Sequence, residues 1–171
     1  MQTVVPDLDD VPRLRQLMQA TFTETFGHLY PARDLAAYLE HAYSTEAVTA
    51  EILAPSNFWR MVLGDDGQPA AYLECVPGHL PHPRCAPEHG EIKRIYVLKS
   101  HQGNGLGNQL MQMALKHFAD RYANAPQWVG VWSENQRAQR LYQAYGFQKV
   151  GEYSFPVGAT EDRDFIFCRQ P

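Results

Sequence analysis

Apolar residues in the first third of the chain recur every three or four positions, which is typical of the buried face of an α-helix. A short apolar run at residues 3–5 precedes them and suits a strand. Residues that favour helix starts stand before each periodic stretch: Asp7 or Asp9, then Pro31, then Ser44 or Thr45. The pattern predicts one short strand followed by three helices within residues 7–54.

The next two apolar runs, residues 58–63 and 69–76, flank a polar stretch that contains Asp66-Gly67. An Asp-Gly pair between two such runs is a strong signal for a β-hairpin turn. The segment 77–90 that follows contains four prolines and three histidines. Because proline lacks a backbone N–H, this segment does not suit a regular helix or a central strand, and we predict a surface loop.

The second half of the chain alternates strand-like and helix-like patterns around a glycine-rich turn. The predicted strands are residues 91–98, 127–132, 147–155 and 164–169, and the predicted helices end near residues 122 and 145. This order of elements predicts an α/β fold with a mixed sheet, helices on both faces, and at least one parallel crossover around the glycine-rich turn.

Length and composition fit one folded unit. The 171 residues match a single domain, and we expect residues 1–171 to form it. The chain is 44% hydrophobic and 20% charged, close to the average of globular proteins that bury a core. No apolar run approaches the roughly 18 to 20 residues of a membrane span, and residues 1–7 lack the basic flank of a signal peptide. These features predict a cytoplasmic protein with no membrane partner.

Charge and cysteine content argue against two further classes. The formal net charge of −4 disfavours a nucleic-acid partner, because binding a duplex needs clustered Lys and Arg. Cys75, Cys85 and Cys168 are odd in number and lack C-x-x-C spacing. We therefore expect neither a disulfide framework nor a thioredoxin-like site.

Four potential metal ligands, His79, His82, Cys85 and His89, follow one another at spacings of three, three and four in the proline-rich segment. Such a set can close on zinc, whereas loops of this composition are more often plain surface. We expect no metal here.

The most informative segment is the turn Gln102-Gly103-Asn104-Gly105-Leu106-Gly107 between a predicted strand and a predicted helix. Glycines let a backbone approach a ligand, and the free N–H groups and dipole at the helix start favour a phosphate or pyrophosphate. The alternative is a tight connection without a ligand. The phosphate-loop pattern is absent and the dinucleotide pattern fails at Asn108, so those two ligand classes are disfavoured.

This turn resembles the Gln/Arg-x-x-Gly-x-Gly/Ala signature of the GNAT superfamily of acetyl-coenzyme A-dependent N-acetyltransferases. A second stretch, residues 135–147, is similar to the family pattern Asn-x-x-Ala-x-x-Leu/Phe-Tyr-x-x-x-Gly-Phe. The two motifs stand in the family's order, and with their flanking elements the resemblance covers nearly the whole chain. It implies a mixed, mostly antiparallel central sheet with helices on both faces.

The resemblance implies acetyl-coenzyme A (acetyl-CoA) as co-substrate. Backbone amides of residues 102–107 would hold its pyrophosphate, and the strand before them would pair with its pantetheine arm. The Val97 amide would polarise the thioester carbonyl, and Asn135 would contact the arm, cap its helix, or do both. The implied coenzyme A contacts are Ile95, Tyr96, Val97, Gln102, Gly103, Asn104, Gly105, Leu106, Gly107, Asn135 and Ala138.

Tyr142 matches the family tyrosine that protonates the departing thiolate. A phenol with a pKa of about 10 can serve as this acid when it lies within hydrogen-bond reach of the sulfur. The alternative is packing, because Tyr142 belongs to an i, i+3, i+4, i+7 stripe that is typical of the buried face of a helix.

The acceptor amine must lose a proton before it attacks. Glu91 matches the base of some family members, six residues before Val97, and the even separation predicts that both side chains share one face of the strand. The alternative is a solvated carboxylate at the strand end, with deprotonation through water alone. Glu134 is a weaker candidate.

Within the superfamily the chain looks most similar to the PaiA-type group, which acetylates spermidine and spermine. The similarity rests on residues 21–26, 37–40, 94–97 and 130–132. It implies a small-molecule acceptor, a polyamine or another small cationic amine. The implied acceptor contacts are Phe22, Glu24, Thr25, Phe26 and Tyr30, although Phe22 and Phe26, four positions apart, also suit one core-facing pair.

Two other functions stay open alternatives: a non-catalytic sensor or regulator that binds acyl-coenzyme A, and an acetyltransferase for peptide or protein N-termini. The presence of Tyr142 and Glu91 favours an enzyme. The sequence also leaves open whether the chain forms a homodimer.

Overall fold

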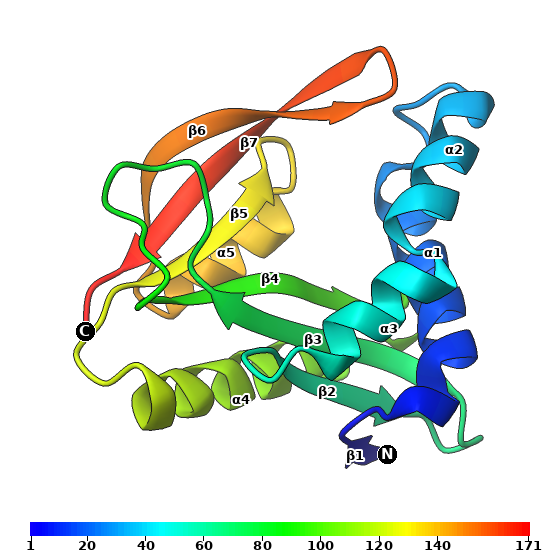
Figure 1. Ribbon diagram of the computed structural model, residues 1–171, viewed down its shortest axis with the longest axis horizontal. Coiled ribbons are helices and arrows are strands. Elements are labelled where there is room, and N and C mark those ends of the chain that lie inside the picture. The colour runs from blue at the N-terminus through cyan, green and yellow to red at the C-terminus, as the bar shows by residue number, and fades with distance from the viewer.

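A computed structural model describes residues 1–171. Its strands are β1 (Gln2–Val4), β2 (Phe58–Leu63), β3 (Pro69–Pro77), β4 (Gly90–Val97), β5 (Gln127–Trp132), β6 (Gln148–Val157) and β7 (Thr160–Arg169). They form one sheet in the order β1-β2-β3-β4-β5-β7-β6 (Figure 1). Every neighbouring pair is antiparallel except β4 and β5, which confirms the predicted mixed, mostly antiparallel sheet.

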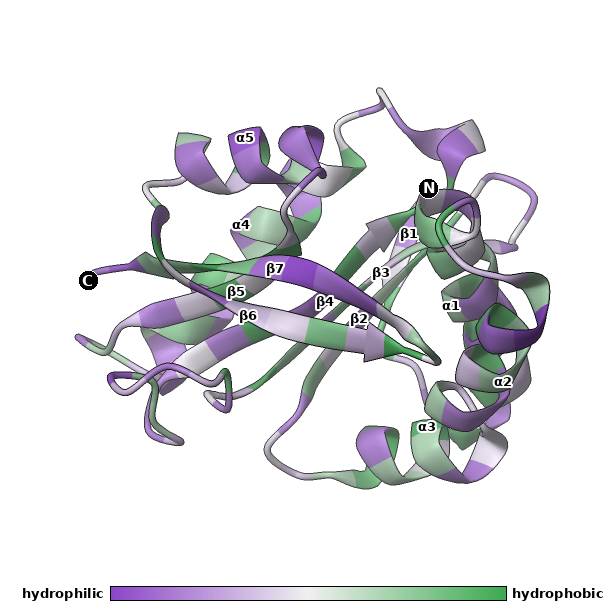
Figure 2. Ribbon diagram, turned by 90° about the horizontal axis from the view of Figure 1, so that it is seen from above, coloured by the Kyte–Doolittle hydropathy of each residue, from purple (hydrophilic) through white to green (hydrophobic).

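Helices cover both faces of this sheet, as predicted. They are α1 (Val11–Phe26), α2 (Ala32–Ala42), α3 (Thr45–Leu53), α4 (Leu106–Arg121) and α5 (Gln136–Ala144). Helices α4 and α5 pack on one face with Ile92 and Val129, and α1–α3 pack on the other with Met61 and Tyr72 (Figure 2). None of the helices has the length and apolar composition needed to cross a membrane.

Side chains next to the helices fix where they begin. The Asp7 carboxylate accepts the Asp9 amide at 2.9 Å and caps a short 3-10 turn, Leu8–Asp10, that runs into α1. At the start of α3, the Ser44 hydroxyl accepts a backbone amide at 3.1 Å. Pro31 directly precedes α2. Of the predicted alternatives, Asp7 and Ser44 are therefore the capping residues.

The closing β6–β7 hairpin is longer than the sequence predicts. Strand β7 begins at Thr160 instead of residue 164, and the chain reverses at Gly158, which has a φ of 59°. The polar run 161–164 lacks apolar alternation, so its pairing with β6 is what makes it a strand. In Figure 1 the hairpin reaches toward α2, where the Ala159 amide lies 3.5 Å from the Asp34 carboxylate.

The parallel strands β4 and β5 separate after a short contact. They pair only between Gly90–Ile92 and Gln127–Val129, although β4 continues to Val97 and β5 to Trp132. Beyond the paired residues, the edge of β4 that faces β5 has no strand partner. The crossover that joins them, through the glycine-rich turn and α4, is the predicted parallel crossover.

A β-bulge interrupts β4 between its two halves. Opposite β3, Cys75 pairs with Ile92 and the preceding Glu74 pairs with Arg94, so Lys93 has no partner. One extra residue in one strand of an antiparallel pair reverses the alternation of side chains beyond it.

The bulge corrects one prediction about Glu91. Ile92, Ile95 and Val97 all pack toward the core cluster beneath α4, although an unbroken strand would place Ile92 on the other face from the last two. The even separation between Glu91 and Val97 therefore does not put them on one face. Glu91 lies on the face that turns toward α1 and α2.

Candidate active site

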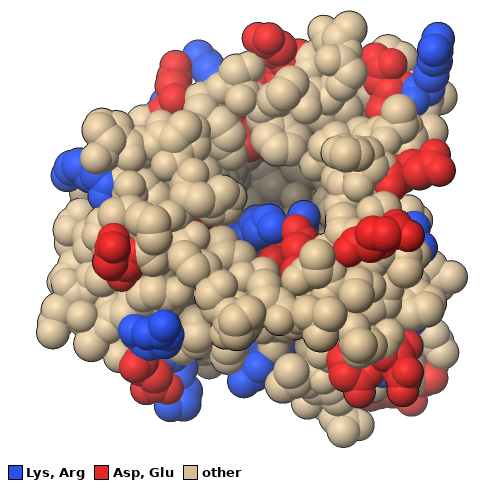
Figure 3. All heavy atoms as spheres, in the orientation of Figure 1, with Lys and Arg blue, Asp and Glu red and all other residues tan.

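One cavity of about 730 Å³ occupies the gap between the separated strands β4 and β5. Figure 3 shows its mouth as a hollow near the centre of the face seen in Figure 1, with acidic and basic side chains at the edge. The cavity extends from the glycine-rich turn to the inner side of the β6–β7 hairpin.

Nearly all the site residues predicted from the sequence line this cavity. Tyr142, Glu91, the five predicted acceptor contacts and ten of the eleven predicted coenzyme A contacts line it. Asn104 does not line the cavity; its side-chain amide donates to the His101 carbonyl at 3.4 Å. The weaker base candidate Glu134 also lies outside the lining.

The glycine-rich turn leaves backbone amides free at one end of the cavity. Gly103 and Gly105 have φ angles of 89° and 80°, and a Cβ at either position would meet no atom within 4 Å. Gly105 is the N-cap of α4 and supplies no side-chain acceptor for the first amides of the helix. These amides and the helix dipole form an anion site that no protein group fills.

The free edge of β4 presents further unpaired backbone groups. The Leu98 amide donates to the Ala70 carbonyl at 2.9 Å, so the amide of Val97, which points the opposite way, faces the gap toward β5. The Val97 carbonyl on the same side accepts the Gln102 side chain at 3.0 Å. The Val97 N–H is left for a ligand that runs along the strand, which fits an extended arm such as pantetheine.

Helix α5 forms the opposite wall. Asn135 accepts the Ala138 amide at 3.1 Å, so it does cap the helix, and its own side-chain N–H groups donate to no protein atom. Arg137 was not among the predicted coenzyme A contacts. It lines the cavity and donates to the Gln102 side chain. A guanidinium beside the anion site is well placed to contact a phosphate.

Tyr142 is both packed and available. Its side chain is 4% exposed and belongs to the core cluster beneath α4, as the packing alternative required. It also lines the cavity, and its hydroxyl has no hydrogen-bond partner in the protein. Burial raises the pKa of Tyr142, so the phenol keeps its proton at neutral pH.

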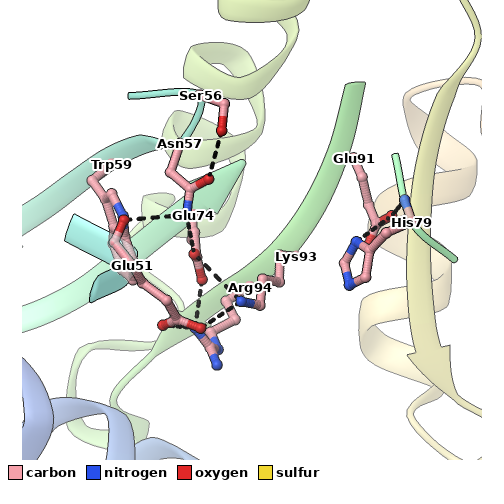
Figure 4. Close-up of polar contacts among 9 residues, drawn as sticks. All are labelled: Glu51, Ser56, Asn57, Trp59, Glu74, His79, Glu91, Lys93 and Arg94. Atoms are coloured by element: carbon pink, nitrogen blue, oxygen red, sulfur yellow. Dashed lines mark hydrogen bonds and ion pairs between the residues drawn. The ribbon is translucent and has the colours of Figure 1, made fainter. Parts of the chain in front are cut away.

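Glu91 is not a solvated carboxylate. It is 2% exposed, and its Oε2 accepts the amides of His79 and Leu80 at 2.8 and 3.1 Å. The same oxygen lies 3.0 Å from Nδ1 of the His79 ring, and the hydrogen bond that the ring donates to this carboxylate raises the pKa of His79. Glu91 thereby holds the segment 77–90 against β4 while it lines the cavity (Figure 4).

The predicted acceptor contacts on α1 form an aromatic wall. Phe22 is 3% exposed and its ring lies 4.7 Å from that of Phe26, so these two are the core-facing pair as well as part of the lining. The Phe26 ring lies edge-on to that of Trp132 on β5, with 5.7 Å between the ring centroids. The Glu24 carboxylate accepts the Lys99 amide at 2.9 Å, which places it near the glycine-rich turn.

Basic side chains near the cavity mouth are already neutralised. Arg94 lies 2.5 Å from Glu74 and 2.6 Å from Glu51, and Lys93 lies 2.5 Å from Glu51 (Figure 4). Although its own burial opposes the charge, these carboxylates raise the pKa of Arg94. With two acids for two bases, the cluster offers no free positive charge to an anionic acceptor.

Two acids at the far end of the cavity were not predicted from the sequence. Asp162 and Asp164 of β7 line it, together with Tyr153 of β6. The run 161–164 contains no apolar residue, so the sequence carries no alternating pattern that would mark it as a strand.

The histidine-rich segment makes separate contacts. His89 accepts the Trp128 indole N–H at 3.0 Å, and His82 accepts the Arg84 amide at 3.2 Å. His79 faces Glu91 as described. No three His, Cys, Asp or Glu side chains are grouped closely enough to hold a metal ion.

An anion-binding turn, a free strand edge and a buried phenol along one cavity are the features of a coenzyme A-dependent acyltransferase. The sequence pattern of the acetyltransferase (GNAT) family matches residues 11–147. An uncharacterised N-acetyltransferase from the pepI 3′ region of Lactobacillus delbrueckii subsp. lactis is 31% identical over 157 residues, which cover 92% of this chain and 90% of the relative. The chain belongs to the GNAT family and is an acetyl-CoA-dependent N-acetyltransferase.

Other relatives cover the fold or a part of the sequence. The PaiA N-acetyltransferase from Thermoplasma acidophilum, solved in complex with coenzyme A, has a TM-score of 0.79 at 16% identity, over 99% of this chain and 98% of that one. The ribosomal-protein-S18-alanine N-acetyltransferase from Escherichia coli has a TM-score of 0.70 at 16% identity, over 99% and 92%. The spermine/spermidine N(1)-acetyltransferase of Bacillus subtilis is 33% identical over 64 residues, which cover 37% of this chain and 42% of the relative.

Proposed function

We propose that this enzyme transfers the acetyl group of acetyl-CoA directly to a small cationic amine, with polyamines as the first candidates. The observation that carries the proposal is the single cavity that joins the anion-binding turn to an acidic end at the β6–β7 hairpin. Because one cavity lies beside both the proposed coenzyme A site and the proposed acceptor site, the amine would attack the thioester directly in a ternary complex, without a covalent enzyme intermediate.

The chain's own groups would bind the co-substrate in three places. The amides of residues 102–107, with Arg137 beside them, hold the pyrophosphate. The free edge of β4 and the unused side-chain N–H groups of Asn135 hold the arm from two sides. The Val97 amide then points at the thioester carbonyl and stabilises the negative charge that develops on its oxygen.

Tyr142 would protonate the departing thiolate. Its hydroxyl lines the cavity without a protein partner, so it can donate to sulfur without breaking another contact. Burial raises the pKa of the phenol, and the same dry surroundings raise the pKa of a thiol leaving beside it. The proton therefore passes between two groups whose pKa values are both raised.

The charges around the acceptor end favour a cation. The two bases on β4 are paired with two glutamates, whereas Asp162 and Asp164 have no basic partner. The partial similarity to the Bacillus subtilis spermine/spermidine enzyme supports the same class of acceptor.

A panel of acceptors tests the proposal. Release of free thiol from acetyl-CoA is measured with spermidine, spermine, an aminoglycoside, a neutral-tailed monoamine and a peptide N-terminus. We expect the polyamines to give the highest kcat/KM. If only the peptide or the monoamine reacts, the acceptor class is wrong; tight coenzyme A binding with no thiol release on any amine would instead support an acyl-coenzyme A sensor.

Glu24→Gln tests the predicted contact between α1 and a distant ammonium. The amide can still accept the Lys99 N–H, so the change removes the charge and keeps the hydrogen bond. Because the contact acts alike in ground and transition states, we expect KM for spermidine to rise about 2- to 5-fold with kcat nearly unchanged.

Glu46→Gln, on the exposed first turn of α3, is the matched control and should change neither parameter. An unchanged KM in the Glu24 variant would remove Glu24 from the acceptor site.

A further inference from the structure

The inner side of the β6–β7 hairpin carries two carboxylates. Asp164 lies opposite Tyr153 in the strand register, Asp162 precedes it on the same face, and all three side chains line the cavity. Glu161 and Arg163 alternate with them and are exposed. The hairpin therefore turns its two aspartates, and no positively charged side chain, toward the acceptor.

Each aspartate is held by a tyrosine hydroxyl and not by a cation. Tyr153 donates to the Asp164 carboxylate at 3.3 Å, and Tyr30 donates to the Asp162 carboxylate. Neither carboxylate forms an ion pair within the chain. Two neighbouring, half-buried carboxylates repel each other, and a positively charged ligand between or beside them relieves that repulsion.

The backbone brings this pair next to the acetyl-transfer groups. A Cβ on Gly130 of β5 would lie 2.8 Å from the Tyr153 hydroxyl, so the glycine makes room for the phenol over the strand. Asp164 pairs with Trp132, where β5 ends before the helix that carries Tyr142. The Tyr142 side chain is 4% exposed, forms no hydrogen bond through its hydroxyl, and lines the same cavity as the two acids, which marks that cavity as a ligand site.

On the basis of the proposed function, we propose that Asp164 takes up the proton that the acceptor ammonium must lose, and that Asp162 binds the amine's positive charge beside it. One N–H bond of the ammonium breaks and an O–H bond forms on Asp164. The free electron pair of nitrogen then attacks the thioester carbon, and the C–S bond breaks with its electrons going to sulfur. Tyr142 protonates that sulfur and recovers a proton from the new amide nitrogen. Asp164 then releases to solvent the proton that it took from the ammonium.

The surroundings of Asp164 suit a group that is ionised at neutral pH and able to hold a proton. Burial raises the pKa of Asp164 to about 6; the hydrogen bond from Tyr153 opposes this shift, and the charge of Asp162 adds to it. A base with a pKa just below the working pH is mostly ionised and still accepts protons well. The other titratable and charged side chains that line the cavity from α1, α2, the segment 77–90, β4 and β6 are Glu24, Tyr30, Tyr38, Tyr43, His79, Glu91, Lys93, Arg94, Tyr96 and Tyr153.

The pH dependence of kcat/KM for the best amine of the acceptor panel tests the assignment. Asp164 is ionised above its pKa, so wild-type kcat/KM should fall as the pH drops through about 6. Asp164→Asn should lower kcat/KM at pH 7 by about 10- to 100-fold and remove this acidic limb, with coenzyme A affinity unchanged. Glu161→Gln, at an exposed position on the opposite face of β7, should leave both kcat/KM and its pH profile unchanged.

Conservative substitutions of two neighbours of Asp164 should shift the acidic limb of the pH profile in opposite directions. Asp162→Asn removes the like charge, so the limb should shift to lower pH by about half a unit to one unit while KM for the amine rises. Tyr153→Phe removes the hydrogen bond to the ionised carboxylate, so the limb should shift to higher pH. A purely structural role for the hairpin predicts neither shift, and these variants keep the test valid even if Asp164→Asn fails to fold.

Glu91→Gln separates the two base candidates. If the acidic limb disappears in this variant and persists in Asp164→Asn, Glu91 is the base and the inference is overturned. If the limb stays where it is in the Asp162, Tyr153 and Asp164 variants alike, it is overturned as well. Failure of the proposed function looks different, because then no amine of the panel releases thiol from the wild-type enzyme.

Discussion

Tyr142→Phe is expected to lower kcat by about 10²- to 10⁴-fold, the usual effect of losing a general acid, with coenzyme A affinity little changed. The substitution removes one oxygen and keeps the ring that packs against Phe147 at 6.1 Å. Since the hydroxyl has no hydrogen-bond partner in the protein, its loss strands no buried donor or acceptor. The variant should therefore fold with wild-type stability, and the rate loss is read from thiol release at saturating amine.

Tyr145→Phe is the matched control for that result. Tyr145 lies one turn further along the same stretch of chain and does not line the cavity; its hydroxyl donates to the Asn108 side chain of α4 at 3.3 Å. Its loss should leave kcat within about 2-fold of wild type, because exposed hydrogen bonds contribute little. A stable Tyr142→Phe enzyme that turns over at the wild-type rate would reduce Tyr142 to a packing residue.

Gly107→Val is expected to weaken coenzyme A binding by about 100-fold or more, as the loss of one or two hydrogen bonds to a charged group implies. A Cβ at Gly107 meets only the Leu141 side chain at 3.6 Å, an ordinary contact, so the protein tolerates the new side chain. The added methyl groups instead stand in the cavity beside the anion site. Gly105 is a poorer choice, because its φ of 80° strains any β-branched residue.

Titration calorimetry with coenzyme A measures the loss, and thermal unfolding checks the fold. Ala119→Val places the same side chain on an exposed position of α4 and should leave affinity unchanged. If the Gly107 variant binds as tightly as wild type, the pyrophosphate lies elsewhere.

Local chemistry determined much of this fold, so the sequence could predict it. Apolar spacing, caps such as Ser44 and Asn135, and the hairpin turn at Gly67 act within a few residues, and each element they predict is present. The glycine-rich turn and the Tyr142 helix also carry their signal within a dozen residues. For this reason the sequence predicted the family and most of the residues that line the cavity.

Long-range pairing decided the rest. The extra residue at Lys93 arises from the register between β3 and β4, and it moves Glu91 to the opposite face from the one that simple alternation predicts. Glu91 then holds a segment whose contact with it no local pattern encodes.

The acidic end of the cavity shows the same division most clearly. By itself, the sequence determined a strand, a glycine-rich turn and two helices, because hydrogen bonds and side chains within each segment stabilise them. The tertiary structure alone decided that the polar run containing Asp162 and Asp164 becomes a strand, since its backbone groups are satisfied only by pairing with β6 and β5. Pairing then fixed which side chains face the cavity, and with them the charge that the acceptor meets.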